Sequence, residues 1–263
     1  PLRLPEMFPD RERFRLRVAR LVARSNAVVA ISHRTRQDLV ELMGVDPARV
    51  HVLYPGRRDG FGPAPADAIA DVAARFDIRG PYILYVGALG PHKNLPTLLR
   101  AFEQVRRRGN VPVTLVLAGS PRWGEATLAA LERLPSRRHV VVTGPVPEAD
   151  LAPLYSGAAC FAFPSLYEGF GLPVLEAMTC GTPVVVSDRG ALPEVVGDGG
   201  LVVDAGDPAA YAEALRSMLD EPRLRAGYAA AAVARAARFS WRESACRLLA
   251  LLRETAVGGA QSA

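Results

Sequence analysis

The chain has 263 residues, of which 49% are hydrophobic and 22% charged, and its formal net charge is +5. This balance is typical of a soluble globular protein, and no apolar run approaches the roughly 18 residues that a membrane span needs. The three cysteines, Cys160, Cys180 and Cys246, lie far apart in apolar segments, which indicates buried thiols in a reducing compartment and disfavours a structural zinc site.

Two further features of the sequence bear on the protein's partners and its location in the cell. Aromatic residues make up 7% of the chain and are scattered, so a nucleic-acid partner is not expected. The chain begins at Pro1 without a signal-peptide pattern, which indicates a fragment or a processed chain. We therefore expect a cytoplasmic protein, and a place at the inner face of the membrane stays open.

Residues 1–56 are predicted to form a small α/β piece. Over residues 10–25, apolar residues and arginines recur at helical spacing; the arginine stripe comprises Arg13, Arg17, Arg20 and Arg24. Such a stripe is most often a solvated face, but it also fits peripheral contact with an anionic membrane. Strands are expected at 27–31 and 50–53. The helix between them is expected to begin after Ser32 and end at Gly44.

Residues 57–80 are predicted to be a linker, because Gly and Pro are frequent in its first part and only a short helix over 67–76 follows. Residues 81–238 alternate short apolar runs with amphipathic segments. The expected strands are 82–86, 113–118, 140–143, 158–163, 183–187 and 201–203. The expected helices are 94–107, 124–133, 148–156, 173–180, 191–196, 208–219 and 222–238.

This alternation predicts an α/β fold, a Rossmann-like parallel sheet with helices on both faces. Residues 239–263 are expected to add a helix over 241–255 and a frayed tail from residue 256. Ligands of such sheets bind beyond the carboxyl ends of the strands. The residues that follow the expected strands are therefore the first candidates for a site.

Residues 164–176 carry the most informative pattern, Pro-Ser-Leu-Tyr-Glu-Gly-Phe-Gly-Leu-Pro-Val-Leu-Glu. A Gly-rich loop leads from a buried strand into a helix, whose first N–H groups form an anion site. Gly169 and Gly171 allow backbone angles that a side chain would block. Glu168 and Glu176 can accept hydrogen bonds from hydroxyl groups. Phosphate and hydroxyl recognition together indicate a sugar nucleotide; the alternative is a turn with two solvated glutamates.

Lys93 is the only lysine in a count of 32 Lys and Arg residues. It follows the predicted strand 82–86 and a glycine turn, and it precedes an amphipathic helix. A compact ammonium group on a flexible stem can follow negative charge onto a phosphate. An ordinary surface lysine is the alternative. Because both candidate segments follow strands, we expect Lys93 and the 164–176 loop at the same edge of the sheet.

Several common motifs are missing from the chain. The turn at 87–90 is not the dinucleotide fingerprint, and Lys93 does not follow a Walker A loop. No Gly-x-Ser-x-Gly elbow indicates a serine hydrolase. No Asp-x-Asp pair is available to hold a metal-bridged diphosphate. The residues therefore predict neither a dinucleotide cofactor nor a metal site.

These motifs resemble the C-terminal part of a GT-B retaining glycosyltransferase of family 4, also called glycosyl transferases group 1. The resemblance is carried by the 168–176 block and by residues 86–94. Weaker matches follow at 117–119, 143–146, 177–185 and 239–241, and residues 28–56 resemble the end of the family's N-terminal, acceptor-binding domain. The likeness covers nearly the whole chain.

The resemblance implies a role for each matching residue. Lys93 and Glu168 would be catalytic: Lys93 neutralises the leaving diphosphate, and Glu168 contacts the transferred sugar near its reacting carbon. Glu176 would bind the ribose. The other donor-binding positions would be Gly87, Asn94, Val146, Gly169, Phe170, Gly171 and Leu172. The family needs no metal ion and no cofactor beyond its co-substrate, a GDP- or UDP-linked sugar, for which we weakly prefer mannose.

Two departures from the family pattern bear on activity. Ala88 stands where members often carry an arginine that contacts the diphosphate. Most of the N-terminal domain, which binds the sugar or lipid-linked acceptor, is missing. We therefore expect this chain to bind a nucleotide-sugar donor but to transfer sugar poorly or not at all alone. The alternatives are a sugar-nucleotide 2-epimerase and a non-catalytic nucleotide-sugar-binding module of a split enzyme.

Overall fold

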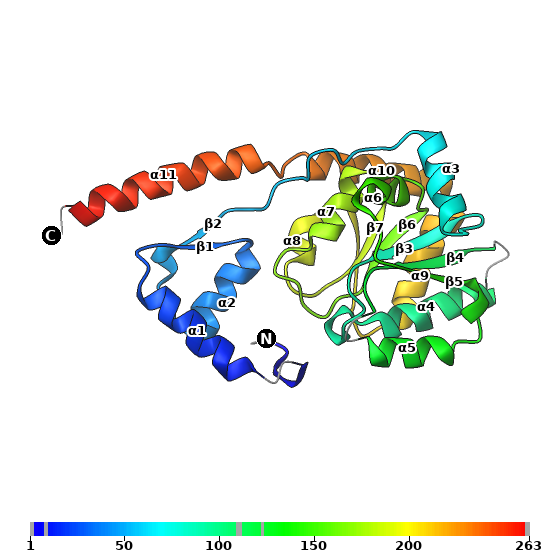
Figure 1. The fold of residues 1–263 in the computed structure, drawn as a ribbon, viewed down its shortest axis with the longest axis horizontal. Coiled ribbons are helices and arrows are strands. Elements are labelled where there is room, and N and C mark those ends of the chain that lie inside the picture. The colour runs from blue at the N-terminus through cyan, green and yellow to red at the C-terminus, as the bar shows by residue number, and fades with distance from the viewer. Residues whose placement is uncertain (1–2, 8–9, 109–111, 122–123, 261–263) are drawn as a thin grey trace. The chain divides into compact units, whose positions relative to one another are not determined.

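The structure, a computed structural model, describes residues 3–7, 10–108, 112–121 and 124–260. The chain divides into two compact units. The smaller unit combines residues 1–57 with residues 239–263, and the larger unit comprises residues 58–238. Each unit has its own parallel sheet, of two and six strands respectively (Figure 1).

The larger unit is built on a sheet in which all neighbouring strands are parallel. The strands are β3 (Tyr82–Val86), β4 (Thr114–Ala118), β5 (Val140–Gly144), β6 (Cys160–Phe163), β7 (Val184–Ser187) and β8 (Gly200–Val203). Their order is β5-β4-β3-β6-β7-β8. The chain therefore adds strands on one side of β3, then returns and adds the rest on the other side. The junction of β3 and β6 is the topological switch point of a Rossmann-like sheet.

Helices cover both faces of this sheet, as Figure 1 shows. They are α3 (Ala66–Arg75), α4 (Leu95–Arg108), α5 (Glu125–Glu132), α6 (Glu148–Ser156), α7 (Leu172–Thr179), α8 (Leu192–Val196), α9 (Pro208–Asp220) and α10 (Pro222–Ala236). Helices α4, α5 and α9 lie on one side of the sheet, and α3, α6 and α7 lie on the other. Helix α10 packs against α7 and α9. The predicted α/β class, a parallel sheet with helices on both faces, is confirmed.

The central strands are buried on both faces, which explains why their sequences are continuously apolar rather than alternating. Ile83 and Leu84 in β3 and all four residues of β6 and of β7 are buried. Aromatic rings stack along the middle of the sheet: the Tyr85 and Phe163 centroids are 5.7 Å apart, as are those of Phe161 and Phe163. This core gives the carboxyl edge of the sheet a rigid base.

Two glycines allow the chain segments after β3 and β4 to touch. The N–H of Gly87 donates to the carbonyl of Ala118 over 2.8 Å. Gly119 has a φ of +141°, and a Cβ placed on it would lie 2.1 Å from the carbonyl oxygen of Gly87. Only glycine fits this contact, because any side chain would force the two backbones apart.

The smaller unit contains α1 (Arg11–Ala23), β1 (Val28–Ala30), α2 (His33–Met43), β2 (Val50–Val52) and α11 (Trp241–Ala260). The Ser32 side chain accepts from the N–H of Thr35 at the start of α2, and Gly44 ends that helix in the left-handed conformation. Both predicted helix boundaries are therefore confirmed. The strands β1 and β2 pair with each other in parallel.

Some boundaries differ from those that the sequence predicts. Residues 58–80, expected to be a linker, belong to the larger unit, where α3 packs against α6. Helix α11 belongs to the smaller unit and continues to Ala260, beyond the expected end at 255, while residues 261–263 of the expected tail lie outside the described residues. Cys246 on α11 is exposed, so the prediction of three buried thiols is wrong for this residue.

Substitution of Gly119 tests the close approach of the two backbones. We expect Gly119→Ala to lower the free energy of unfolding by roughly 2–4 kcal/mol, from positive-φ strain and from the clash with Gly87. Gly227→Ala is the matched control, because a Cβ at this exposed position of α10 meets nothing within 4 Å. It should raise stability by about 0.5–1 kcal/mol. Urea unfolding followed by circular dichroism measures both; equal stability of the two variants would contradict the packing described.

Candidate functional site

The two segments that the sequence singles out lie side by side where β3 and β6 end. The N–H of Leu166 donates to the carbonyl of His92 over 2.8 Å. The Asn94 side chain donates to the carbonyl of Pro164 over 3.2 Å. The loop after β3 and the loop after β6 are thus hydrogen-bonded to each other at the switch point of the sheet. This is where ligands of doubly wound sheets bind.

Lys93 and Glu168 form an ion pair across these two loops. The Lys93 Nζ lies 2.6 Å from Oε1 of Glu168, and the side chains are 14% and 16% exposed. The ammonium also lies 5.0 Å from the centroid of the Phe163 ring, a position in which the ring face attracts a cation. In this state the carboxylate is the counter-ion of the lysine.

The backbone around Glu168 is held by the turn that follows β7. The N–H of Ala191 donates to the carbonyl of Glu168 over 3.0 Å. Gly190 has a φ of +62°, and a Cβ on it would lie 2.5 Å from that same carbonyl oxygen. Glycine at 190 therefore lets the two loops approach and positions the carboxylate. The sequence pattern of residues 164–176 gives no hint of this contact, since Gly190 lies outside that segment.

His92 adjoins the ion pair. Burial, and secondarily the charge of Lys93, lower the pKa of His92 below its usual value, while Glu168 opposes that shift. This shift favours the uncharged imidazole beside Lys93. The sequence does not assign His92 a role, and in the structure its carbonyl serves to join the two loops.

Asn94 connects three loops. Its backbone has a φ of +54°, in the left-handed region that Asn tolerates better than most residues. Its Nδ2 donates to the carbonyls of Pro164 and Ala205, and its Oδ1 accepts from the hydroxyl of Thr97 over 2.9 Å. The side chain thus ties the loop after β3 to those after β6 and β8. Its assignment as a donor-binding position stays a prediction.

The Gly-rich loop ends at the N-terminus of α7. Gly171 has a φ of +104°, and a Cβ on it would lie 2.7 Å from Cδ2 of Leu192. Its carbonyl accepts from the N–H groups of Val174 and Leu175, which starts the helix. Phe170 is buried and Leu172 is 48% exposed. Glu168 lies in the loop that precedes the first turn of α7, and helix N-termini attract anions.

Glu176, one turn into α7, is held by two groups. The Tyr155 hydroxyl donates to Oε2 over 2.9 Å, and Nη1 of Arg58 lies 3.5 Å from Oε1. Burial raises the pKa of Glu176 above its usual value, and the bonds from Tyr155 and Arg58 oppose that shift. The Glu176 carboxylate is therefore mostly shielded from solvent, and its Oε1 faces Arg58.

The remaining predicted positions lie on neighbouring strand ends. Gly87 follows β3, with its N–H on Ala118. Val146 is half-buried after β5, two residues before Glu148 begins α6. Glu148 in turn lies 2.6 Å from Arg58. The predicted residues are thus distributed over the ends of β3, β5 and β6.

Sequence reasoning did not select Arg58, Tyr155 or Glu148. Arg58 lies in a Gly- and Pro-rich segment, and Tyr155 lies near the end of α6, so neither follows a strand. No local signal marks them, because the contacts of Arg58 and Tyr155 with Glu176, and of Glu148 with Arg58, exist only in the folded chain.

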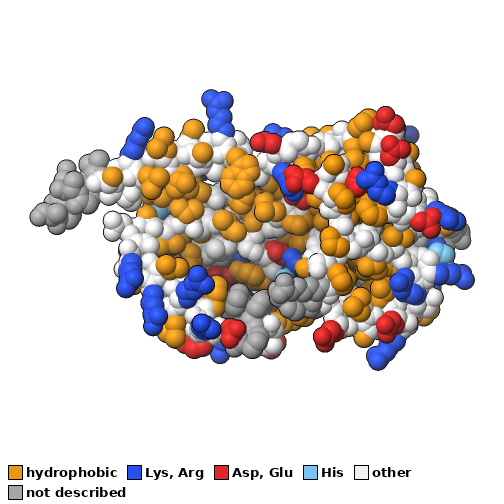
Figure 2. Space-filling model, viewed as in Figure 1, with side chains coloured by type: hydrophobic (Ala, Val, Ile, Leu, Met, Phe, Trp, Pro, Cys, Tyr) orange, Lys and Arg blue, Asp and Glu red, His pale blue; other side chains and the backbone are white. Residues whose placement is uncertain are grey.

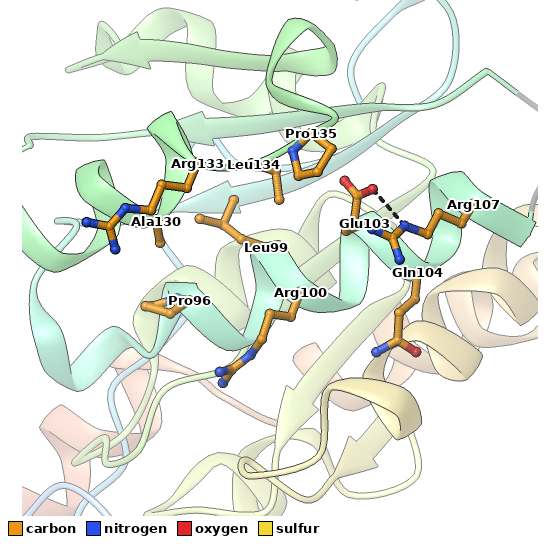
Figure 3. A pocket seen from close by; sticks show the side chains of 10 residues that line it. All are labelled: Pro96, Leu99, Arg100, Glu103, Gln104, Arg107, Ala130, Arg133, Leu134 and Pro135. Atoms are coloured by element: carbon orange, nitrogen blue, oxygen red, sulfur yellow. Dashed lines mark hydrogen bonds and ion pairs between the residues drawn. The ribbon is translucent and has the colours of Figure 1, made fainter.

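Among the residues that the structure describes, no group of three or more His, Cys, Asp or Glu side chains could hold a metal ion. Within the same residues, no helix has the length and apolarity that a bilayer crossing requires. The structure also has a groove of about 410 Å³ beside α4 and the end of α5 (Figure 3). Its lining includes Leu99, Arg100 and Arg133 and contains no predicted site residue.

The fold is a doubly wound parallel α/β sheet with an ion pair at its switch point, and the comparisons with known proteins identify the family. The chain belongs to the glycosyl transferases group 1 family, whose model matches residues 72–235. A second model, Glycosyltransferase Family 4, matches residues 4–59. The predicted membership of the GT-B group is therefore confirmed.

Curated relatives are longer than this chain. An O-antigen chain mannosyltransferase B from Escherichia coli is 35% identical over 217 residues, which are 81% of this chain and 57% of the relative. A D-inositol 3-phosphate glycosyltransferase from Xylanimonas cellulosilytica is 37% identical over 237 residues, which are 87% of this chain and again 57% of the relative. The chain thus spans somewhat more than half the length of these relatives.

Solved structures share the fold. A sucrose-phosphate synthase from Thermosynechococcus elongatus has a TM-score of 0.80 and 26% identity, with 94% of this chain and 62% of that chain covered. Anabaena Alr3699/HepE in complex with UDP and glucose has a TM-score of 0.84 and 22% identity, with 96% and 69% covered. The latter likeness shows the fold alone.

Two substitutions at Asn94 separate its backbone from its side chain. Asn94→Gly keeps the left-handed backbone but removes the three hydrogen bonds, and it should lower the free energy of unfolding by roughly 2–3 kcal/mol. Asn94→Ala should lose about 1 kcal/mol more, from left-handed strain. Urea unfolding measures both. If Asn94→Gly is as stable as the parent chain, the side chain does not hold the three loops together.

Proposed function

We propose that this chain is the donor-binding half of a retaining glycosyltransferase, which moves a sugar from a nucleotide-sugar donor to a sugar or lipid-linked acceptor. The observation that carries the proposal is the Lys93–Glu168 pair at the switch point, with Glu168 in the loop that leads into α7 at Leu172. An ammonium, a helix N-terminus and a carboxylate are the groups that a diphosphate and a sugar hydroxyl need. The names of the relatives and the UDP complex of Alr3699/HepE support it.

Lys93 stabilises the leaving diphosphate in this proposal. The donor's phosphate replaces Glu168 as the partner of Nζ, and negative charge then grows on that phosphate as the bond to the sugar breaks. A preorganised donor of this kind typically lowers a barrier by roughly 3–4 kcal/mol. The N–H groups of residues 169–172 share the same charge. With these donors the reaction needs no metal ion and no further cofactor.

Glu168 acts on the transferred sugar. Once a phosphate has taken its place at Lys93, the carboxylate is free to accept from a sugar hydroxyl close to the reacting carbon and to stabilise the positive charge that develops there. Retention of the anomeric configuration follows from the family resemblance. We prefer mannose as the transferred sugar, a choice supported by the mannosyltransferase among the relatives.

The nucleoside is held further along the same edge. Glu176 accepts from the ribose hydroxyls, and the backbone near Val146 meets the base, with GDP and UDP as the expected leaving groups. The 2-epimerase and the non-catalytic donor-binding module remain the alternatives. Both would use the same pocket, so binding alone does not distinguish them from a transferase.

Peripheral membrane contact through α1 is a separate proposal. None of the residues of this helix is buried, and Phe14, Leu16 and Leu21 are exposed between arginines. Figure 2 shows Lys and Arg side chains, in blue, gathered at the surface of this helix. An amphipathic basic helix of this kind can lie on an anionic membrane.

Calorimetric titration of the 263-residue chain with GDP, UDP and ADP tests the donor site. We expect Lys93→Ala to lower the affinity for the preferred nucleoside diphosphate by roughly 10- to 100-fold, because a charge-assisted contact with phosphate is lost. Arg100→Ala is the control, an exposed basic residue of the neighbouring helix α4. Equal affinities for the Lys93→Ala and parent chains would remove the proposed role, as would a parent chain that binds none of the three.

Transfer by the isolated chain is expected to be negligible, because the acceptor and donor must be oriented together for catalysis. The measurement is product formation from GDP-mannose or UDP-glucose with a panel of sugar and lipid-linked acceptors. Adding a separately produced N-terminal domain of a relative should raise the rate. Rapid transfer by the 263-residue chain alone would refute this expectation, and formation of the C2 epimer without any acceptor would favour the epimerase.

A further inference from the structure

Arg58 faces the carboxylate that we assign to the ribose. Its Nη1 lies 3.5 Å from Oε1 of Glu176, and its Nη2 lies 2.6 Å from Oε1 of Glu148. The guanidinium thus bridges a carboxylate on α7 and one at the start of α6. The second of these follows the loop that contains Val146, the expected position of the base. Arg58 therefore lies between the groups proposed for the two parts of a nucleoside.

An aromatic ring supports the guanidinium. The Arg58 Cζ lies 5.1 Å from the centroid of Phe61, and Phe61 lies 6.2 Å from the ring of Tyr155. Tyr155 itself donates to Oε2 of Glu176. The arginine is therefore held by an ion pair and a ring face, on the side of Glu176 that Tyr155 does not occupy. Its side chain is 40% exposed and that of Glu176 is 16% exposed.

We propose that Arg58 is a positioning residue, which keeps Glu176 ionised and oriented so that it accepts both hydroxyls of the ribose of a nucleoside diphosphate. This inference rests on the proposed function and deepens it. Only a carboxylate can accept two hydroxyl donors while also accepting from Tyr155 and Arg58, because a protonated acid has one donor and fewer acceptor sites. Because the contact between Arg58 and Glu176 is long, Oε1 of Glu176 can still accept a hydrogen bond from a ribose hydroxyl.

The surroundings of Glu176 explain why a neighbouring positive charge is needed to keep its carboxylate ionised. Burial raises its pKa, and Glu148 raises it slightly more; the Tyr155 hydroxyl and Arg58 lower it. Cys180, the residue that follows α7, is a buried thiol whose pKa is raised to about 11, so it stays neutral at neutral pH. Among the groups named, Arg58 is the one positive charge. Its removal should raise the pKa of Glu176 further, and affinity for a ribose should then fall at a higher pH than in the parent chain.

A contribution of Arg58 to stability alone would be small. Ion pairs as exposed as those of Arg58 typically contribute little to the free energy of unfolding. Arg75 on α3 offers a matched control, because it forms a comparably short ion pair with Asp150 on α6 and contacts no proposed site residue. Replacing either arginine removes one guanidinium from α6, but only Arg58 also faces Glu176.

Calorimetry with three ligands between pH 5.5 and 8 tests the inference on the 263-residue chain. The ligands are the preferred nucleoside diphosphate, its 2′,3′-dideoxy analogue and inorganic pyrophosphate. We expect Arg58→Ala to lower the affinity for the ribonucleotide by about three- to tenfold at the acid end, where more of Glu176 becomes protonated without the arginine, and by less at pH 8. Arg58→Lys should restore most of the affinity. Arg75→Ala should behave as the parent chain.

The dideoxy analogue and pyrophosphate make the outcomes distinct. Neither offers ribose hydroxyls, so the loss on Arg58→Ala should be absent for both. An equal loss for all three ligands would overturn the inference by showing a general effect on the pocket. A loss confined to the ribonucleotide but independent of pH would contradict the effect of Arg58 on the ionisation of Glu176 and support its effect on orientation. Unchanged ribonucleotide affinity would overturn it while leaving the donor site intact. A parent chain that binds no nucleotide would refute the proposed function itself.

Discussion

The reversal of strand order between β3 and β6 is the constraint on which the site depends. Because β4 and β5 lie on one side of β3 and β7 and β8 lie beyond β6, the loops after β3 and β6 lead into helices on opposite faces of the sheet. Two such loops start from neighbouring strands and then diverge. The Lys93–Glu168 ion pair joins the two loops at that point.

The charged groups of this site are all partnered within the protein. Lys93 is neutralised by Glu168, and Glu176 is held by Tyr155 and Arg58. Mostly buried charges require such partners, since an unpaired one would carry a large desolvation penalty. In the proposed function, donor binding would replace the partners of Lys93 and Glu176 with groups of the donor, so neither charge would become buried without a partner. The phosphate would take Lys93 from Glu168, and the ribose would join Tyr155 and Arg58 at Glu176.

The glycines around the site have a common physical role. Gly119 and Gly190 have positive φ angles, and each places its Cα against the backbone of another loop, at Gly87 and Glu168 respectively. A side chain at either position would push the loops apart. Asn94 has the same kind of backbone but adds an amide that reaches two carbonyls and a hydroxyl. The loops are therefore held by close backbone contact and by one polar side chain.

The chain sequence by itself determined the parallel α/β class and the two loops of the site. Continuous apolar runs mark strands buried on both faces, and capping residues such as Ser32 and Gly44 mark helix ends, because these are local properties. The tertiary structure alone decided the strand order, the placement of α11 in the smaller unit and the exposure of Cys246. It alone brought Arg58 to Glu176 and Gly190 to Glu168. Such contacts join residues far apart in the chain, and no local pattern of residue types encodes them.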